Sequence, residues 1–207
     1  MNKLDDIITD SVFFDLCRYI EQHHMLYEHN HVSSTYAEEL LYKALKRNKF
    51  ICNWQCGSHK PGTDITVFPK NGSNLGSIGI SCKGGTESLK ALEFSGSRTT
   101  KQKTIEDKLL LLSASGGDVL ICLVCDRTVP GVFSYKLHVI DSSRIDYSKL
   151  TWNRVANKWL GAGIFSAEIT DSMSAQVWTT IPKSFIHKTR QYVVDLNQYN
   201  DLESIGA

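Results

Sequence analysis

The spacing of apolar side chains predicts two helices in the first quarter of the chain. Across residues 4–28 apolar side chains recur every three or four positions, as on one face of a helix. A second helix is predicted over residues 36–45, with a core face formed by Leu41, Ala44 and Leu45. The histidines that follow the first apolar stripe are expected in a polar, solvated connector: His23, His24, His29 and His31.

Hydroxyl side chains mark the start of the second helix. Residues 33–35 read Ser-Ser-Thr, and Glu38 follows Thr35 at the spacing of a capping box. Glu38 also precedes Leu41 and Leu45 at helical spacing, so it borders the apolar face and can point toward the edge of a sheet. Two roles for Glu38 therefore stay open, one as a cap and one as a ligand in a site.

After the second helix the pattern changes to that of strands. One strand is expected to begin near residues 50–52, and residues 65–68 and 75–80 form two further runs. The segment between these two runs contains Asn-Gly, which is typical of a hairpin turn, so an antiparallel hairpin is predicted. A turn is expected after it, at residues 83–85.

The second strand of this hairpin has two different faces, because side chains alternate along a strand. The apolar face carries Ile78, Ile80 and Cys82. The other face is small and polar, and carries Ser77, Gly79, Ser81 and Lys83. A polar face of small residues leaves room for a ligand.

The rest of the chain alternates helix and strand signals. We expect a helix over residues 99–113 that buries Ile105, Leu109, Leu110 and Leu112. A buried strand is expected over 118–125 and another strand over 132–140. Two shorter strands are predicted within residues 163–186, and a helical or irregular tail over 187–207. This order of elements predicts an α/β fold, in which a mixed central β-sheet is flanked by helices.

Composition and charge add few constraints. The length suits a single domain over residues 1–207 with a sizeable core. The formal net charge is +1, so a DNA-binding face would need local clustering of basic side chains. No signal peptide is evident and no apolar run is long enough to cross a bilayer, so we expect a cytoplasmic protein without a membrane partner.

The six cysteines are expected to be reduced thiols, as is usual in a cytoplasm. Cys122 and Cys125 lie in a predicted buried strand, where cysteine behaves as a small hydrophobic residue. Cys52, Cys56 and His59 have the spacing of half a zinc site, but the sequence offers no second half. A structural zinc site is therefore not favoured.

A carboxylate and an ammonium group meet at one end of the predicted hairpin. Asp64 starts the first strand and Lys83 ends the second, with Ser81 beside it on the same face. A carboxylate can hold Mg²⁺, and a lysine can position or deprotonate water or offset developing charge. These residues are the minimum parts for metal-assisted hydrolysis of a phosphodiester.

This arrangement resembles the PD-(D/E)XK nuclease superfamily, and type II restriction endonucleases most of all. The family motif is an Asp on one strand and an acidic-x-Lys sequence on the next, which Asp64 and Lys83 match. Two positions differ, because the proline is Pro61 and the acidic position is Ser81. Some restriction enzymes of this family carry Ser-x-Lys and recruit a glutamate from elsewhere. The predicted elements over residues 33–125 also follow the order of a restriction-enzyme core.

The resemblance implies an endonuclease that depends on Mg²⁺ and cuts both strands of DNA at a short sequence, as a homodimer. Asp64 and a glutamate would hold the metal, while Lys83 assists the in-line attack of water on phosphorus. Glu38 is the leading glutamate, since the family often places one on the helix before the hairpin. Glu87 and Glu93 are displaced alternatives, and Glu93 is favoured if the chain after Lys83 folds back across the site.

Contacts with double-stranded DNA are expected from the loop that precedes the helix at 99–113. Small hydroxyl residues let the backbone approach phosphate, the amides of a helix N-terminus assist, and Arg98 can pair with guanine or phosphate. Gln176 is a candidate for base readout, although its segment equally fits a hairpin with Val177 and Trp178 in the core. The loop residues proposed for DNA contact are Ser97, Arg98, Thr99, Thr100 and Lys101.

Two other functions stay open. One is a repair or nicking nuclease on the same fold. The other is a non-catalytic DNA-binding protein that has lost its acidic motif residue, an alternative that Ser81 keeps open.

Overall fold

The computed structural model describes residues 7–27, 30–54, 63–68, 76–98, 101, 104–114, 117–170 and 175–198. The α-helices in this part of the chain are α2 (Asp10–Tyr27), α3 (Ser34–Arg47) and α4 (Ile105–Ala114). Short 3-10 helices are η1 (Ser142–Arg144), η2 (Tyr147–Lys149) and η3 (Lys183–Phe185). The strands are β1 (Ile51–Trp54), β2 (Ile65–Phe68), β3 (Ile78–Glu87), β4 (Ala91–Arg98), β5 (Val119–Asp126), β6 (Val132–Asp141), β7 (Thr151–Asn153), β8 (Lys158–Leu160), β9 (Ser166–Ile169), β10 (Gln176–Pro182) and β11 (Ile186–Asp195).

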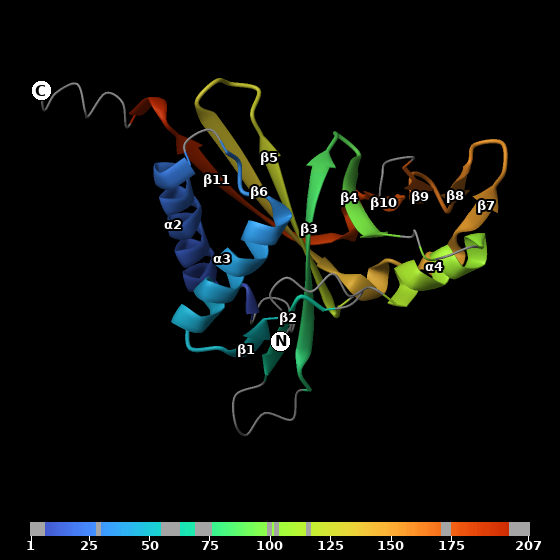
Figure 1. Ribbon diagram of the computed structural model, residues 1–207, viewed down its shortest axis with the longest axis horizontal. Helices are drawn as coiled ribbons and strands as arrows, with labels where there is room; N and C mark the ends of the chain where they lie inside the picture. Colours follow the sequence, from blue (N-terminus) through green and yellow to red (C-terminus); the bar gives the residue numbers. More distant parts are fainter. Residues whose placement is uncertain are drawn as a thin grey trace, which may run out of the picture.

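The strands form one large mixed sheet of eleven strands within the described residues. Its order is β11-β6-β5-β3-β4-β10-β9-β8-β7, and β2 branches from β3 with β1 beside it (Figure 1). β3 and β5 are parallel, with β4 and α4 between them in the chain, and the other pairs are antiparallel. The predicted α/β class with a mixed central sheet is confirmed.

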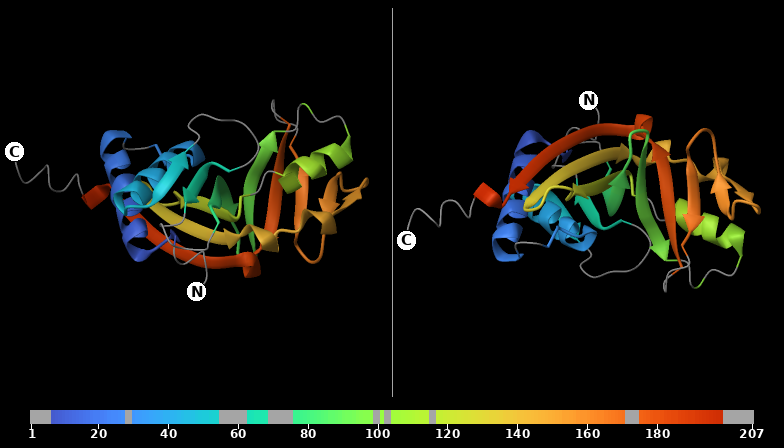
Figure 2. Two further views of the ribbon diagram at one scale, coloured as in Figure 1. Left: turned by 90° about the horizontal axis from the view of Figure 1, so that it is seen from below. Right: turned by 90° about the horizontal axis from the view of Figure 1, so that it is seen from above.

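Each face of the sheet carries its own apolar core. α2 and α3 cover the first core at one end of the molecule, whereas α4 and the strands β7–β10 lie at the other end (Figure 2). On β5, Val119, Ile121 and Leu123 enter the first core, while the alternate residues Leu120, Cys122 and Val124 enter the second. Burial on both faces explains why this strand reads as an unbroken apolar run.

The histidines of α2 differ from the prediction. His23 and His24 lie inside the helix and are buried, not solvated in a connector. His23 Nε2 lies 3.1 Å from the Asn30 carbonyl oxygen, and His24 Nε2 lies 2.7 Å from the Tyr135 hydroxyl. A buried imidazole needs such partners, and the Tyr135 partner comes from a strand 111 residues away. His29 is outside the described residues, and His31 is exposed between the helices.

The start of α3 also differs. The N-cap is Ser33, without a side-chain capping bond, and Thr35 is already inside the helix. The capping box of Thr35 and Glu38 is therefore wrong, because Glu38 lies in the second turn. The core face is confirmed, since Leu41, Ala44 and Leu45 are buried.

The hairpin of β2 and β3 forms as predicted, with Ile65 opposite Ile80. The turn expected at residues 83–85 is wrong, because β3 continues to Glu87 and pairs with β4. A Cβ atom added at Gly85 would overlap the Glu93 carbonyl oxygen and the Cys122 sulfur. The glycine that suggested a turn instead permits close packing of the sheet.

The extension of β3 and β4 shifts the next helix. α4 begins at Ile105, not near residue 99, and Thr104 Oγ1 accepts a hydrogen bond from the Asp107 amide at 3.0 Å. Leu112 is buried as expected, and Leu109 is partly buried against the second core. Leu110 is 69% exposed, so its predicted burial is wrong.

The end of the chain contains a strand where a tail was expected. β11 spans ten residues and pairs along β6, with Arg190 opposite Leu137. The alternation of apolar and polar residues along β11 is too weak to predict a strand from the sequence alone. Pairing with β6 stabilises the strand. The strands predicted over 132–140 and within 163–186 are confirmed by β6, β9 and β10, and residues 171–174 are outside the described part.

The described cysteines are all free thiols: Cys17, Cys52, Cys82, Cys122 and Cys125. Cys52 is buried in the first core, and the other two residues of the possible zinc half-site, Cys56 and His59, lie outside the described residues. Among the helices described, none is long and apolar enough to cross a membrane.

Candidate functional site

The two edges of β3 differ in how completely they are paired. β5 pairs with β3 continuously from Ile80 to Gly85. On the opposite edge β2 reaches only as far as Ile80, and β4 begins at Gly85. No described strand pairs with residues 81–84 on that edge, which lies between β2 at one end of β3 and β4 at the other (Figure 1). The β3 edge therefore has a gap where Ser81 and Lys83 are located.

Asp64 lies at this gap and is held rigidly. Its amide donates a hydrogen bond to the Ile80 carbonyl oxygen at 2.9 Å. Its carboxylate Oδ2 accepts hydrogen bonds from the Cys82 amide at 2.7 Å and from Ser81 Oγ at 3.2 Å. Because both donors bind the same oxygen, Oδ1 has no hydrogen-bond donor within the described residues and is available to another ligand.

Glu38 reaches the same site from α3 and is partly buried. Its pKa is raised to about 7, with burial as the largest cause and the charge of Asp64 as the second. The Lys83 ammonium and the Trp54 indole N–H act to lower it. Trp54 Nε1 is buried and has no hydrogen bond of ordinary geometry within the described residues. Glu38, Asp64 and Lys83 therefore lie within electrostatic reach of one another.

Ser81 and Lys83 also line a cavity of about 720 Å³ on the α4 side of the sheet. Ser81 is fully buried, and Lys83 is partly exposed. The carboxylates of Asp64 and Glu38 do not line this cavity. The site thus spans the sheet at the β3 gap, with the carboxylates at the edge and the lysine beside the cavity.

The oxygen atoms of Asp64 and Glu38 suit a hard cation such as Mg²⁺, which keeps several water ligands and often binds one or two carboxylates. A cation between them would offset the repulsion that contributes to the raised pKa of Glu38. The described residues contain no group of three His, Cys, Asp or Glu side chains that could hold a metal. A cation here would need water or a phosphate oxygen to complete its coordination.

The two displaced glutamates lie elsewhere. Glu93 is paired with Thr86 across β3 and β4 and accepts a hydrogen bond from Thr86 Oγ1 at 3.4 Å. Five residues separate Thr86 from Ser81, which is about 16 Å along a strand. Glu87 forms ion pairs with Lys136 and Lys183. The structure therefore places Glu38 near Asp64, whereas Glu87 and Glu93 lie elsewhere.

The residues proposed for DNA contact are only partly described. Ser97 and Arg98 belong to the end of β4, so the backbone there is a strand and not the start of a helix. Lys101 is exposed, and Thr99 and Thr100 are outside the described residues. The neighbouring Gly96 lines the same cavity as Lys83, so the end of β4 borders that cavity.

Gln176 lies in β10 opposite Arg98. Its Nε2 donates a hydrogen bond to the Gly96 carbonyl oxygen at 3.1 Å, and Val177 beside it is fully buried. The hairpin interpretation is therefore confirmed for the strand pairing and for Val177, whereas Trp178 is only partly buried.

Sequence reasoning missed Trp54 and the acidic wall of the cavity. Trp54 pairs with Ile65 in β2 and is thereby placed next to Asp64. The position of Trp54 depends on the pairing of β1 with β2, which the spacing of residues in the sequence does not reveal. Asp118, Asp141 and Asp146 lie at strand ends and turns far apart in the sequence, and only the folded chain places them along one cavity.

The chain matches no known protein-family model, and no curated protein or solved structure is significantly similar to it. The function must therefore be argued from the geometry of the site.

Proposed function

We propose that this protein is a Mg²⁺-dependent endonuclease that cleaves double-stranded DNA at a short specific sequence, as type II restriction enzymes do. The observation that carries the proposal is the meeting of Glu38, Asp64 and Lys83, from one helix and two strands, at the β3 gap. Two carboxylates and an ammonium group in one site suit metal-assisted phosphodiester hydrolysis.

The order of the elements around the site supports the same function. A helix (α3) precedes three antiparallel strands (β1, β2 and β3), and a second helix (α4) precedes a strand (β5) parallel to the third. This order resembles the layout expected of restriction-enzyme cores, with β4 inserted before the second helix. The glutamate on the first helix also matches the position from which that family often recruits one.

Each residue then has a chemical role. When bound, Mg²⁺ would polarise the phosphate and lower the pKa of the attacking water. Asp64 and Glu38 would hold it, and the Ser81 hydroxyl and Cys82 amide keep the Asp64 carboxylate in place. Lys83 would hold the attacking water and offset the negative charge that develops on phosphate. Water attacks phosphorus in line, and the bond to the leaving sugar oxygen breaks.

A homodimer is part of this proposal, because cutting both strands of a duplex at one site requires two active sites. A second candidate is a DNA-binding protein that does not cleave. Ser81 favours it, because it gives Asp64 a hydrogen bond where the family motif supplies a metal ligand. A nicking or repair nuclease on the same fold is a third candidate, for which a monomer is expected.

The test is cleavage of supercoiled plasmid DNA with Mg²⁺ or with EDTA, by the wild type and by Asp64→Asn and Lys83→Met. Matched controls are Asp126→Asn and Lys90→Met, since both residues are exposed and outside the site. Discrete fragments that need Mg²⁺, disappear in both site variants and persist in both controls would support the proposal.

Other results would favour the alternatives. Nicked circles would indicate a nicking enzyme, and a smear would indicate cleavage without sequence specificity. DNA binding in a gel-shift assay without cleavage under any condition would contradict both nuclease functions and support the non-catalytic protein.

A further inference from the structure

The outer face of α2 is open to solvent in the part of the chain that the structure describes. The helix lies at one end of the molecule, where its inner face packs against α3 and β11 and carries residues of the first core (Figure 1 and Figure 2). On the outer face the Phe14 side chain is 63% exposed and that of Met25 is 59% exposed. Large apolar side chains exposed together on one helix face are typical of a contact surface.

Four residues of this outer face form one stripe along the helix axis. Phe14, Arg18, Glu21 and Met25 follow one another at steps of four, three and four positions, which return to the same side of an α-helix. The same alternation of four and three defines the a and d positions, through which paired helices contact each other. We refer to these four residues as the α2 stripe, and its spacing is that of a helix-pairing surface.

The α2 stripe is complementary to a second copy of itself. When two copies of α2 run antiparallel with Phe14 opposite Met25, the same register places Arg18 opposite Glu21. A two-fold axis repeats both contacts, so the sulfur of Met25 meets an aromatic ring at each end and opposite charges meet in the middle. A parallel pair in register would instead place Arg18 against Arg18. The charges therefore specify the antiparallel pair.

The stripe is held in position and its charged groups can bind a partner. Arg190 of β11 lies over the Phe13 ring, 5.2 Å from its centroid, and so fixes α2 on the sheet. Arg18 is exposed and forms no ion pair within the described residues. Glu21 hydrogen-bonds Tyr192 of β11, and its carboxylate has acceptor sites for a second partner as well.

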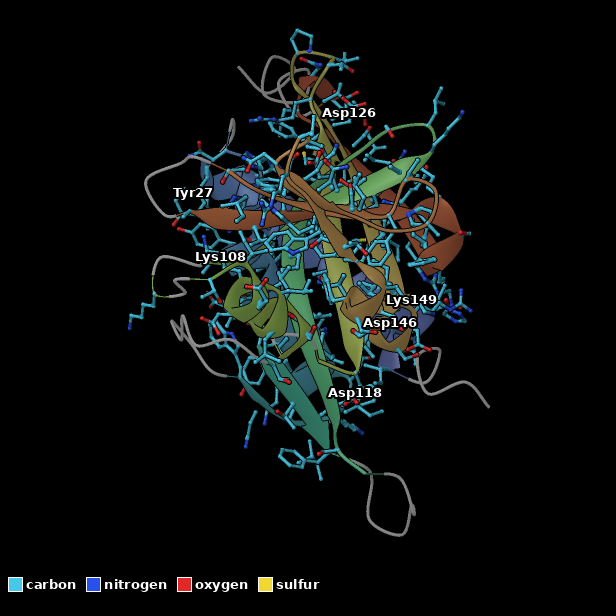
Figure 3. All side chains as sticks on the ribbon, turned by 90° about the vertical axis from the view of Figure 1, so that its right-hand side faces the viewer. Tyr27, Lys108, Asp118, Asp126, Asp146 and Lys149 are labelled. Carbon is cyan, nitrogen blue, oxygen red and sulfur yellow. The ribbon has the colours of Figure 1, made fainter. Side chains whose placement is uncertain are left out.

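We propose that α2 forms the interface of a homodimer, in which two copies of the protein pair antiparallel through the α2 stripe. This inference rests on the proposed function, because cleavage of both DNA strands at one site requires two active sites. No residue of the stripe lines the cavity beside Lys83. Tyr27, at the C-terminal end of α2, is well separated in Figure 3 from the cavity residues Asp118 and Asp146. Pairing through α2 therefore leaves the cavity side of the sheet open to DNA.

The test measures the size of the protein by sedimentation velocity in EDTA without DNA, between about 1 and 100 µM, the range in which a small interface forms. The wild type is expected to dimerise. Arg18→Glu and Glu21→Arg should each weaken the dimer at least about tenfold, because each places like charges opposite each other. An equimolar mixture of these two variants should dimerise as the wild type does, because every charged contact between them joins opposite charges. The matched controls are Lys90→Glu and Glu106→Arg, since both residues are exposed outside α2.

A second pair of variants tests the apolar contacts, and replaces the first pair if circular dichroism shows that Glu21→Arg is unfolded. Phe14→Asp and Met25→Lys should each be monomeric alone, because each places a charge against an apolar side chain of the other copy. Their mixture should dimerise, because one end of the helix pair then joins opposite charges and the other keeps the contact of Phe14 with Met25.

A wild type that is monomeric at every concentration would overturn the inference. Single variants that dimerise like the wild type, or mixtures that stay monomeric, would overturn it as well. Dimers that follow the charge pattern in a protein that never cleaves DNA would contradict the proposed function and leave the interface standing. Cleavage by a protein whose dimer is unchanged by these substitutions would support the proposed function and remove the interface.

Discussion

Glu38, on α3 beside the middle of β3, and Glu87, at the end of β3, are two partly buried carboxylates with opposite environments. The Glu87 side chain is 12% exposed, and Lys136 Nζ and Lys183 Nζ lie 2.5 Å and 2.7 Å from its oxygens. Burial acts to raise the pKa of Glu87, but the hydrogen bonds from the two lysines outweigh it, and the pKa is lowered. Among the described residues Glu38 forms no such ion pair, and its pKa is raised to about 7.

The difference teaches how to separate a structural carboxylate from a functional one. Lys136 and Lys183 form ion pairs with Glu87, so its negative charge is balanced within the fold. Glu38 faces another carboxylate, Asp64, and Lys83 only partly offsets the cost of ionising it. A carboxylate that the fold leaves unbalanced is suited to a cation from outside, which is why perturbed pKa values gather at functional sites.

The largest expected difference between substitutions of the two glutamates is in DNA-cleavage activity. Glu38→Gln is expected to lower Mg²⁺-dependent cleavage of plasmid DNA by about 100-fold, about 2.7 kcal/mol of transition-state stabilisation. The matched variant Glu87→Gln should keep most of the activity, because its carboxylate does not reach Asp64. Initial rates at saturating Mg²⁺ test this, and equal losses in both variants would remove the distinction.

For the free energy of unfolding we expect the reverse, with Glu87→Gln as the more harmful substitution. Glu87→Gln leaves Lys136 and Lys183 without their carboxylate and is expected to lower the free energy of unfolding by about 2 kcal/mol at pH 7. Because the folded pKa of Glu87 is lowered, its stabilisation is complete above the unfolded value near 4.5 and is lost as the pH falls through the folded value. Urea denaturation at pH 7 and pH 4 should show the gap between variant and wild type narrowing in acid.

Removing the Glu38 charge should instead stabilise the metal-free protein. The folded pKa of about 7 lies above the ordinary glutamate pKa of 4.5, so ionisation costs the wild type stability as the pH rises from 4.5 through 7. Glu38→Gln avoids that cost, and we expect a gain of about 1–2 kcal/mol at pH 8, less than the full shift implies because Glu38 is partly solvated. Urea denaturation in EDTA should show no gain at pH 4, and a gain there of the same size would contradict the electrostatic cause.

Metal binding should follow the same ionisation. Mg²⁺ needs the ionised Glu38, so its apparent affinity should rise about tenfold between pH 6 and pH 8 and level off at higher pH. Thermal shift or calorimetric titrations measure this, and addition of EDTA should reverse the stabilisation. The pH dependence should be absent in Glu38→Gln and unchanged in Glu87→Gln.

The smallest effect is expected at Ser81. Ser81→Ala removes one hydrogen bond to Asp64 Oδ2 but leaves the shorter one from the Cys82 amide. We expect a loss of about threefold in cleavage rate, or about 0.7 kcal/mol, because the Asp64 carboxylate keeps its second hydrogen-bond donor. A loss as large as that of Glu38→Gln would mean that Ser81 itself touches the metal or the substrate.

Elements with a strong local pattern were predictable from the sequence. The hairpin of β2 and β3, the core face of α3 and the buried strand β5 all carry complete periodicity within a short segment. β4 and β11 were not predicted, because their partners are distant segments and their own alternation is weak. The burial of the α2 histidines was not predicted for the same reason, since the partner of His24 is Tyr135 of the distant strand β6.

The candidate site divides in the same way. The sequence by itself determined that Asp64, Ser81 and Lys83 lie at one end of a hairpin, because strand period and turn chemistry act within twenty residues. Only the tertiary structure decided that Glu38 faces Asp64, that Glu87 is balanced by lysines, and that the β3 edge is open between β2 and β4. Burial and charge–charge interaction depend on distances between segments far apart in the chain, and those distances are set by packing.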